Sequence, residues 1–191
     1  PALDQEHIVQ LQTKSIHKSL YVFKSFDELK ENINETATVV FLLDVLEHIE
    51  DSYEFLRNIT EQQFISDQTI FIITVPAFQF LYSSRDHFLG HCRRYNNSLL
   101  KEVISAAKLQ SLNNGYFFFS LLPLRLIQVI FEKFKKTERK TTTVAIWRGN
   151  NTISCLIKML LLFDFRVSLF FKKINIKLPG LTIFTICQKP V

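Results

Sequence analysis

The chain has 191 residues, of which 47% are hydrophobic and 21% are charged, and this composition is typical of one globular domain rather than of a disordered or collagen-like chain. Its net charge of +5 is compatible with anionic small molecules, nucleic acid or an acidic membrane face, but also with a plain solvated basic surface. Three dispersed cysteines without a Cys-x-x-Cys pair argue against a disulfide scaffold and predict a reducing, cytoplasmic location.

Local patterns in the first quarter of the chain predict two helices and two strands. We expect a short helix at residues 4–11, a short strand at 20–24 and a helix over 25–33, where Ser25 and Glu28 form a capping-box pattern. The apolar run Val39–Leu43 predicts a strand that is buried on both faces of a parallel sheet.

The next elements continue the alternation of helix and strand. Asp51 is expected to cap a helix with Tyr53, Leu56 and Ile59 on one face. A second buried strand is predicted over Thr69–Val75 and ends at Pro76, which has no N–H to donate. Long loops are usually functional, and a long polar connection follows at 77–96.

The last part of the chain is predicted to contain three helices and two strands. In chain order these are a helix at 97–108, a strand at 116–120, helices at 123–134 and 151–163, and a strand at 181–187. Alternating strands and helices predict an open α/β sheet.

Two long apolar stretches, residues 116–134 and 153–171, raise the question of a membrane span. Both contain charged residues, among them Arg125 and Asp164, and a charge near the centre of a spanning helix is costly. We therefore expect buried or interfacial helices, which leaves peripheral membrane contact open. No secretory signal is expected at the N-terminus.

Ligands of open α/β sheets bind beyond the carboxyl ends of the strands, and three segments of this kind contain reactive side chains. The acidic Asp44–Asp51 follows the first long strand, Thr74–Phe78 ends the second, and Arg85–Tyr95 gathers arginines and histidines in one loop. Arginine pairs with carboxylate or phosphate groups and histidine can act as a general base. Each segment also has a purely structural interpretation. Asp44–Asp51 could be a helix cap, Thr74–Phe78 a simple strand end, and Arg85–Tyr95 a loop whose arginines pair with surface acids.

The segments in this order resemble class I S-adenosylmethionine-dependent methyltransferases. VVFLLDVLEHIED (39–51) resembles their strand and LEH segment, and TIFIITVPAF (69–78) resembles their next strand. SSRDHFLGHCRRY (83–95) is similar to a loop of a small-molecule branch of the family, and LPGLTIFTICQKP (178–190) to the closing antiparallel strand. The resemblance is weakest over 137–171.

The resemblance implies methyl transfer from S-adenosyl-L-methionine to a small-molecule acceptor. The basic loop and the aromatic, apolar segment Tyr116–Leu126 suggest from composition that this acceptor is anionic or lipid-linked. It implies cofactor contacts by Ser25, Phe26, Asp27, Leu43, Asp44 and Val45. As the general base we expect His91, then His87 or His48. Substrate contacts are expected from Pro76, Phe78, Arg93, Arg94 and Tyr95. No metal is required.

The chain departs from the family in its glycines. Gly90, Gly115, Gly149 and Gly180 are too dispersed for a Gly-x-Gly turn, and glycine lets a backbone approach a cofactor closely. We therefore expect an N-terminally truncated domain that lacks the glycine-loop βαβ unit. The expected fold is an open, Rossmann-like, mainly parallel sheet with flanking helices and a C-terminal antiparallel strand, with the first strand or strands missing.

The expected organisation is a single methyltransferase-like domain over residues 1–191. Within it, residues 77–96 would be the substrate loop and residues 116–178 a helical C-terminal elaboration. The methyl acceptor, the choice of O, N or C as the methylated atom, and the oligomeric state stay open.

Three other functions are weighed against this one. A truncated or degenerate domain could serve as a non-catalytic binding module. His87, His91 and Cys92 are spaced closely enough to suggest zinc, but no second cluster completes a tetrahedral site. Nucleic-acid binding is disfavoured by the moderate charge and by the lack of a recognised module. It would use Arg85, Arg93, Arg94 and Lys133–Lys140.

Overall fold

The computed structural model describes residues 23, 28–30, 35–135, 150–174 and 176–190. The helix predicted at residues 4–11 and the three predicted adenine contacts lie outside the described residues; these contacts are Ser25, Phe26 and Asp27. Of the helix predicted over 25–33, residues 28–30 are described and are helical.

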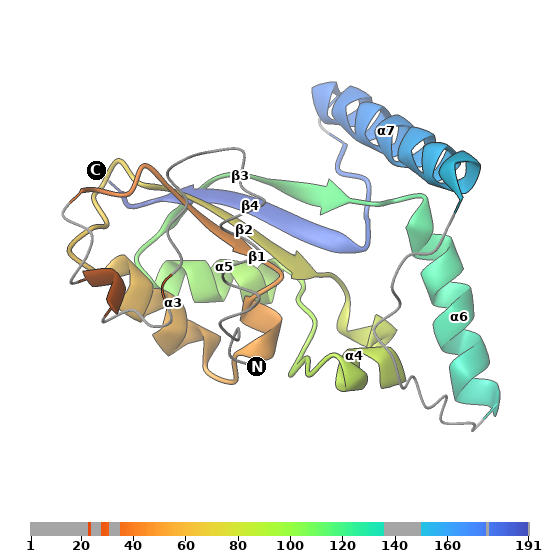
Figure 1. Cartoon of the computed structure of the whole chain (residues 1–191), viewed down its shortest axis with the longest axis horizontal. Coiled ribbons are helices and arrows are strands. Elements are labelled where there is room, and N and C mark those ends of the chain that lie inside the picture. The colour runs from red at the N-terminus through yellow and green to blue at the C-terminus, as the bar shows by residue number, and fades with distance from the viewer. Residues whose placement is uncertain (1–22, 24–27, 31–34, 136–149, 175, 191) are drawn as a thin grey trace.

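The protein is an α/β structure built around a four-stranded mixed sheet (Figure 1). Its strands are β1 (Val39–Leu43), β2 (Ile70–Pro76), β3 (Gln110–Phe117) and β4 (Thr182–Gln188), in the spatial order β1-β2-β4-β3. β1 and β2 are parallel, whereas β4 is antiparallel to both β2 and β3. The carboxyl ends of β1, β2 and β3 therefore meet at one edge, and the predicted antiparallel C-terminal strand is confirmed.

Helices α3 (Ser52–Thr60) and α5 (Asn97–Ala106) pack against one face of the sheet (Figure 1). Each is preceded by a capping residue whose side chain accepts a hydrogen bond from the first turn: Asp51 from the Glu54 N–H at 2.9 Å and Asn96 from the Leu99 N–H at 2.8 Å. Apolar side chains at helical spacing then form the core against the sheet, and they include Leu56, Ile59, Leu100, Val103 and Ile104.

The prediction that residues 39–43 are buried on both faces is wrong. Leu42 of β1 is buried in the core, but Phe41 on the opposite face is 61% exposed. β1 is the edge strand of the described sheet, and the described helices that pack against it lie on the Leu42 side. An apolar run predicts a strand, but only its neighbours determine how much of it is covered.

Two predicted boundaries also shift. β3 begins at Gln110, six residues before the predicted start, because a polar segment pairs with β4 across a bulge between Ser111 and Asn113. This segment has low β propensity, so pairing with a neighbour overrides it. Helix α7 (Asn151–Lys173) runs ten residues beyond the predicted end at residue 163.

Helix α6 (Leu121–Lys135) follows β3 at the carboxyl edge of the sheet, and α7 lies near β3 on the face opposite α3 and α5 (Figure 1). Asp164 of α7 is buried and accepts the Ser120 N–H at 3.1 Å, so it joins α7 to the segment that precedes α6. Among the described helices, none is both long and apolar enough to cross a membrane.

Candidate functional site at the carboxyl end of the parallel strands

The chain leaves β1 through an unusual backbone conformation at Asp44. Its φ is 53°, a left-handed value that aspartate tolerates better than most residues. The Asp44 N–H donates to the carbonyl oxygen and to Oγ1 of Thr74, both at 3.1 Å, and the Thr74 hydroxyl donates to Asp44 Oδ1 at 3.1 Å. The end of β2 thus holds an exposed carboxylate at the end of β1.

A second left-handed residue follows β2. Phe78 has a φ of 63°, and its N–H donates to the Tyr95 carbonyl at 2.7 Å. Its ring stacks on Tyr116 with centroids 5.7 Å apart and lies 5.3 Å from Phe80. Strained non-glycine residues gather at functional sites, and here two of them follow the two parallel strands directly.

The segment after Asp44 forms a short 3-10 turn, η1 (Leu46–His48), in which three neighbours face different surroundings. Leu46 is in the core, Glu47 is 1% exposed and His48 is exposed. Burial raises the pKa of Glu47 to about 7, and the negative charge of Asp44 adds to this rise. Within the described part of the chain, neither carboxylate oxygen of Glu47 has a hydrogen-bond partner.

The loop at 83–95 packs directly on this turn, as expected for segments at one sheet edge. The Cys92 N–H donates to the Glu47 carbonyl at 2.7 Å, and the Tyr95 hydroxyl donates to the Leu46 carbonyl at 3.1 Å. The Arg93 guanidinium donates to the Glu50 carbonyl oxygen. Three contacts therefore fix the loop against the end of β1.

The loop contains a buried ionic network centred on Asp86. Helix α4 (Ser84–Phe88) begins with a capping box in which Asp86 accepts the Ser83 N–H at 3.0 Å. The same carboxylate accepts from Arg94 Nε at 2.8 Å and from Arg125 of α6 at 3.0 Å. Burial alone would raise the pKa of Asp86, but hydrogen bonds and the charge of Arg94 outweigh it and hold this pKa below its usual value. Asp86 is therefore ionised and is the shared acceptor of this network.

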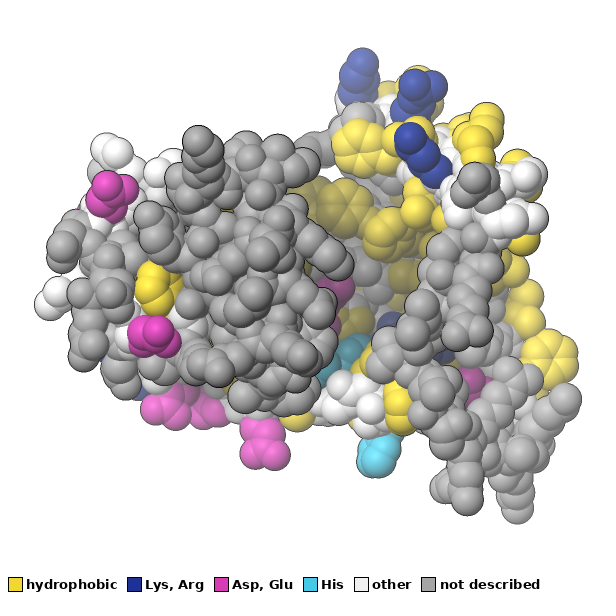
Figure 2. Space-filling view, in the orientation of Figure 1, with side chains coloured by type: hydrophobic (Ala, Val, Ile, Leu, Met, Phe, Trp, Pro, Cys, Tyr) yellow, Lys and Arg dark blue, Asp and Glu magenta, His cyan; other side chains and the backbone are white. Residues whose placement is uncertain are grey.

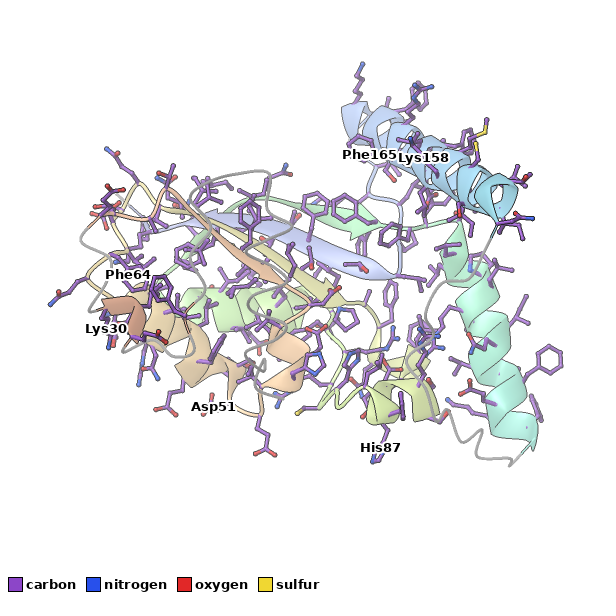
Figure 3. The ribbon with its side chains drawn as sticks, viewed as in Figure 1. Lys30, Asp51, Phe64, His87, Lys158 and Phe165 are labelled. Carbon is purple, nitrogen blue, oxygen red and sulfur yellow. The ribbon has the colours of Figure 1, made fainter. Side chains whose placement is uncertain are left out.

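The three histidines in the described part of the chain separate into a pair and an isolated residue. The rings of His48 and His91 meet edge to face, with centroids 4.7 Å apart. His91 Nδ1 lies 3.1 Å from Asp86 Oδ1, and burial lowers the pKa of His91 below its usual value. His87 is exposed on α4 and points away from the sheet (Figure 3). Figure 2 shows histidine colour both in the central hollow of this view and at its lower edge, where Figure 3 labels His87.

The predicted substrate contacts have different surroundings. Tyr95 is fully buried in the core, and Arg94, besides pairing with Asp86, donates to the Ala77 carbonyl at 3.1 Å. Pro76 ends β2 and its carbonyl accepts the Tyr95 N–H at 2.8 Å. Phe78 and Arg93 are partly exposed. The alternative in which loop arginines pair with acids thus describes Arg94, although its acid is buried rather than at the surface.

Of the predicted cofactor residues, Leu43, Asp44 and Val45 lie together at the end of β1. Leu43 and Asp44 are exposed, and Val45 packs against the core. The proposed zinc set of His87, His91 and Cys92 does not form. In the described ranges the group of three potential ligands is instead Glu47, His48 and His91.

Sequence reasoning missed three residues of this site: Glu47, Asp86 and Arg125. The Ser83-x-x-Asp86 spacing is a capping pattern that could have identified Asp86 as a helix-start residue. Arg125, a charge inside an apolar stretch, was an indication of a buried ion pair. Nothing in the pattern indicates that Glu47 is buried without a partner.

Cavities of the described structure also lie away from this edge. One of about 360 Å³ is lined by residues of β3, β4 and α7, including Tyr116, Phe165 and Lys177. Another of about 380 Å³ lies beside α5. The first shares Tyr116 with the aromatic group around Phe78, so it could hold an apolar part of a ligand. The reactive side chains lie at the strand ends, and we take those ends as the site.

An α/β protein with polar side chains at the carboxyl ends of parallel strands belongs to the class that binds ligands at this edge. By sequence, no family model and no curated protein matches the chain. By structure, it is similar to a SAM-dependent methyltransferase from Archaeoglobus fulgidus, with a TM-score of 0.48, 14% identity, and coverage of 97% of this chain and 73% of that one.

A second solved structure is phosphoethanolamine N-methyltransferase 2 of Haemonchus contortus in complex with S-adenosyl-L-methionine. The TM-score is 0.38 and the identity is 14%, with coverage of 81% of this chain and 33% of that one.

Proposed function

We propose that the protein transfers a methyl group from S-adenosyl-L-methionine to a small-molecule acceptor. One observation carries the proposal: Asp44 is held by Thr74 in a left-handed conformation at the carboxyl end of β1. This is the place where an open α/β sheet binds its ligand, and it lies within the segment that resembles the methyltransferase family. The antiparallel strand at the C-terminus agrees with the closing strand implied by that resemblance.

The proposed cofactor contacts at this edge are Leu43, Asp44 and Val45. The Asp44 carboxylate is exposed, and only one of its oxygens is used by Thr74 in the described contacts. It can therefore accept hydrogen bonds from hydroxyl or amino groups of the cofactor. Contacts of Ser25, Phe26 and Asp27 with the adenine are carried by the resemblance alone.

The acceptor is proposed to lie between Asp44 and the loop at 77–96. Methyl transfer needs an acceptor atom in line with the sulfonium methyl group, so the enzyme acts mainly by positioning its two substrates. Phe78 and Phe80 offer aromatic faces there, and Arg93 offers a charge for an anionic group. Among the histidines, His91 has the best geometry for a base, because Asp86 orients its ring from Nδ1 and leaves Nε2 available.

We propose that the surface of α6 and α7 makes peripheral membrane contact. Such a surface would suit an acceptor that has an apolar part. Exposed apolar side chains cover both helices (yellow in Figure 2) and include Leu124, Phe131, Phe134, Met159 and Phe163. Lys158 and Arg166 are exposed on α7. Apolar and basic side chains on one helix are typical of interfacial binding to anionic lipid.

Cosedimentation with vesicles containing phosphatidylserine tests this contact. We expect the double variant Phe134→Ser and Phe163→Ser to lower the bound fraction several-fold, since each substitution removes exposed apolar area from the contact. Phe64→Leu, a core-side substitution far from α6, is the control. Equal sedimentation of both variants would contradict membrane contact.

The alternative function, a non-catalytic binding module, differs in one measurable property. Such a module could bind the cofactor or an acceptor without releasing S-adenosylhomocysteine. Screening anionic and lipid-linked acceptors for release of this product therefore separates the two functions once cofactor binding is established.

Calorimetric titration of S-adenosyl-L-methionine into the protein tests the cofactor site. Asp44→Asn keeps a residue that tolerates the left-handed conformation but removes the charge. We expect at least about tenfold weaker binding, since hydrogen bonds to charged groups contribute about 1.5–3 kcal/mol. Asp67→Asn, at an exposed turn, should bind as the unaltered protein does. Unchanged affinity of Asp44→Asn would remove the assignment.

A further inference from the structure

Glu47 is a buried carboxylate for which the described fold offers no partner. Its side chain is 1% exposed, and neither oxygen has a hydrogen bond in the described part of the chain. Burying a polar group without a partner is costly, and buried charges are normally paired or bound to a metal. The nearby Asp86 shows the contrast, since it has two arginines and a histidine as partners.

Two imidazoles lie beside this carboxylate, and both are oriented from the same ring nitrogen. His91 Nδ1 is 3.1 Å from the Asp86 carboxylate, and His48 Nδ1 is 3.3 Å from the Gly90 carbonyl oxygen. The carbonyl oxygen can only accept, so His48 Nδ1 must be the donor. With Nδ1 donating, Nε2 of each ring has a free lone pair.

The three side chains converge. One potential ligand atom from each of Glu47, His48 and His91 lies within 4.8 Å of the others, and the two rings are in contact. Ligands of a tetrahedral zinc ion at about 2.0–2.1 Å are about 3.4 Å apart. Side-chain movements of roughly 1 Å would therefore close the three ligands around an ion.

We propose that Glu47, His48 and His91 form a binding site for a divalent transition-metal ion, with zinc as the first candidate. Two imidazoles and one carboxylate are a set used by catalytic metal sites that leave a coordination position open. Metal-bound histidines usually donate their other N–H to a carboxylate or backbone carbonyl, and Asp86 and Gly90 take these two places. The sequence-based expectation that no metal is needed would then be replaced.

The site goes beyond methyl transfer and does not depend on it. If the proposed function holds as well, an open position next to Asp44 would bind an oxygen of the acceptor and make its proton more acidic. His48 and His91 would then act as ligands rather than as general bases.

Zinc titration of the metal-depleted full chain tests the proposal, with bound metal measured by elemental analysis after dialysis. We expect one equivalent of zinc and a higher unfolding midpoint on binding. Glu47→Gln, which keeps the shape of the side chain, and His48→Ala, at an exposed position, should each weaken binding about 100-fold or more. His87→Ala removes a neighbouring exposed histidine and should bind zinc as the unaltered chain does.

Three results would overturn the site: no stoichiometric zinc, affinity unchanged in both Glu47→Gln and His48→Ala, or an equal loss in His87→Ala. Circular dichroism confirms that each variant is folded before the titration. Binding of S-adenosyl-L-methionine to the metal-depleted protein is measured separately. A protein that binds the cofactor but not zinc refutes the metal site alone, and one that binds zinc but not the cofactor refutes the methyltransferase proposal alone.

Discussion

The loop at 83–95 and the helical pair α6 and α7 distribute their side chains in opposite ways. The loop buries charge: the Asp86 carboxylate is enclosed with Arg94 and Arg125, and each charge has a partner. The helical pair exposes apolar surface, from Leu124 on α6 to Phe170 on α7. The first region satisfies its polar groups internally, whereas much apolar surface of the second stays in water.

This difference indicates that the loop contributes to stability and the helical pair to interaction with other molecules. A buried charge network is strongly destabilised when one partner is removed, so the loop should contribute to folding through Asp86. Exposed apolar patches of this extent instead mark surfaces for partners or membranes. Arg125 and Asp164 are the exceptions that join the two regions to the rest of the protein, because each buries a charge from α6 or α7.

The largest expected effect is that of removing the Asp86 carboxylate. Asp86→Ala leaves the buried guanidinium groups of Arg94 and Arg125 without their carboxylate, and we expect a loss of about 3–5 kcal/mol in the free energy of unfolding. Urea denaturation followed by circular dichroism measures it. Asp67→Ala, at an exposed turn, should change stability by about 0.5 kcal/mol or less. Similar losses of unfolding free energy in both variants would mean that the Asp86 network does not stabilise the loop.

A leucine pair compares the core with the helical surface directly. Leu56 on α3 is fully buried, whereas Leu124 on α6 is 63% exposed. Leu56→Ala should cost about 2–5 kcal/mol because it leaves a cavity, and Leu124→Ala about 0.5 kcal/mol or less. The same denaturation experiment applies. A loss above about 2 kcal/mol for Leu124→Ala would show that α6 packs against something that covers it in solution.

The smallest expected effect concerns thiol reactivity and does not alter the fold. Cys92 and Cys155 are exposed, whereas Cys187 in β4 is buried, and burial raises the pKa of the Cys187 thiol to about 11. Because the thiolate is the reactive form, a chromogenic disulfide reagent at pH 8 should label two thiols quickly and the third only in denaturant. Rapid native labelling of Cys187, identified by mass spectrometry, would contradict the packing of β4.

Much of the fold follows from local pattern. The apolar runs predicted the bounds of β1, β2 and β4 to within one residue, and Asp51 caps α3 as its position indicated. The polar start of β3 escaped prediction because its pairing partner, β4, lies some 70 residues later in the chain. The length of α7 was not predicted either, since its apolar residues continue without a strong helix-ending signal.

The sequence by itself determined that polar segments follow apolar strands, and therefore that Asp44, Phe78 and the loop histidines would lie near one sheet edge. Strand direction is enough for this, because parallel strands bring their carboxyl ends together. Only the tertiary structure decided that Asp86 would pair with Arg125, 39 residues away, and that His87 would point into solvent. It also decided that Glu47 would be buried beside two imidazoles. Burial and charge pairing depend on which distant segments pack together, and local periodicity does not contain that information.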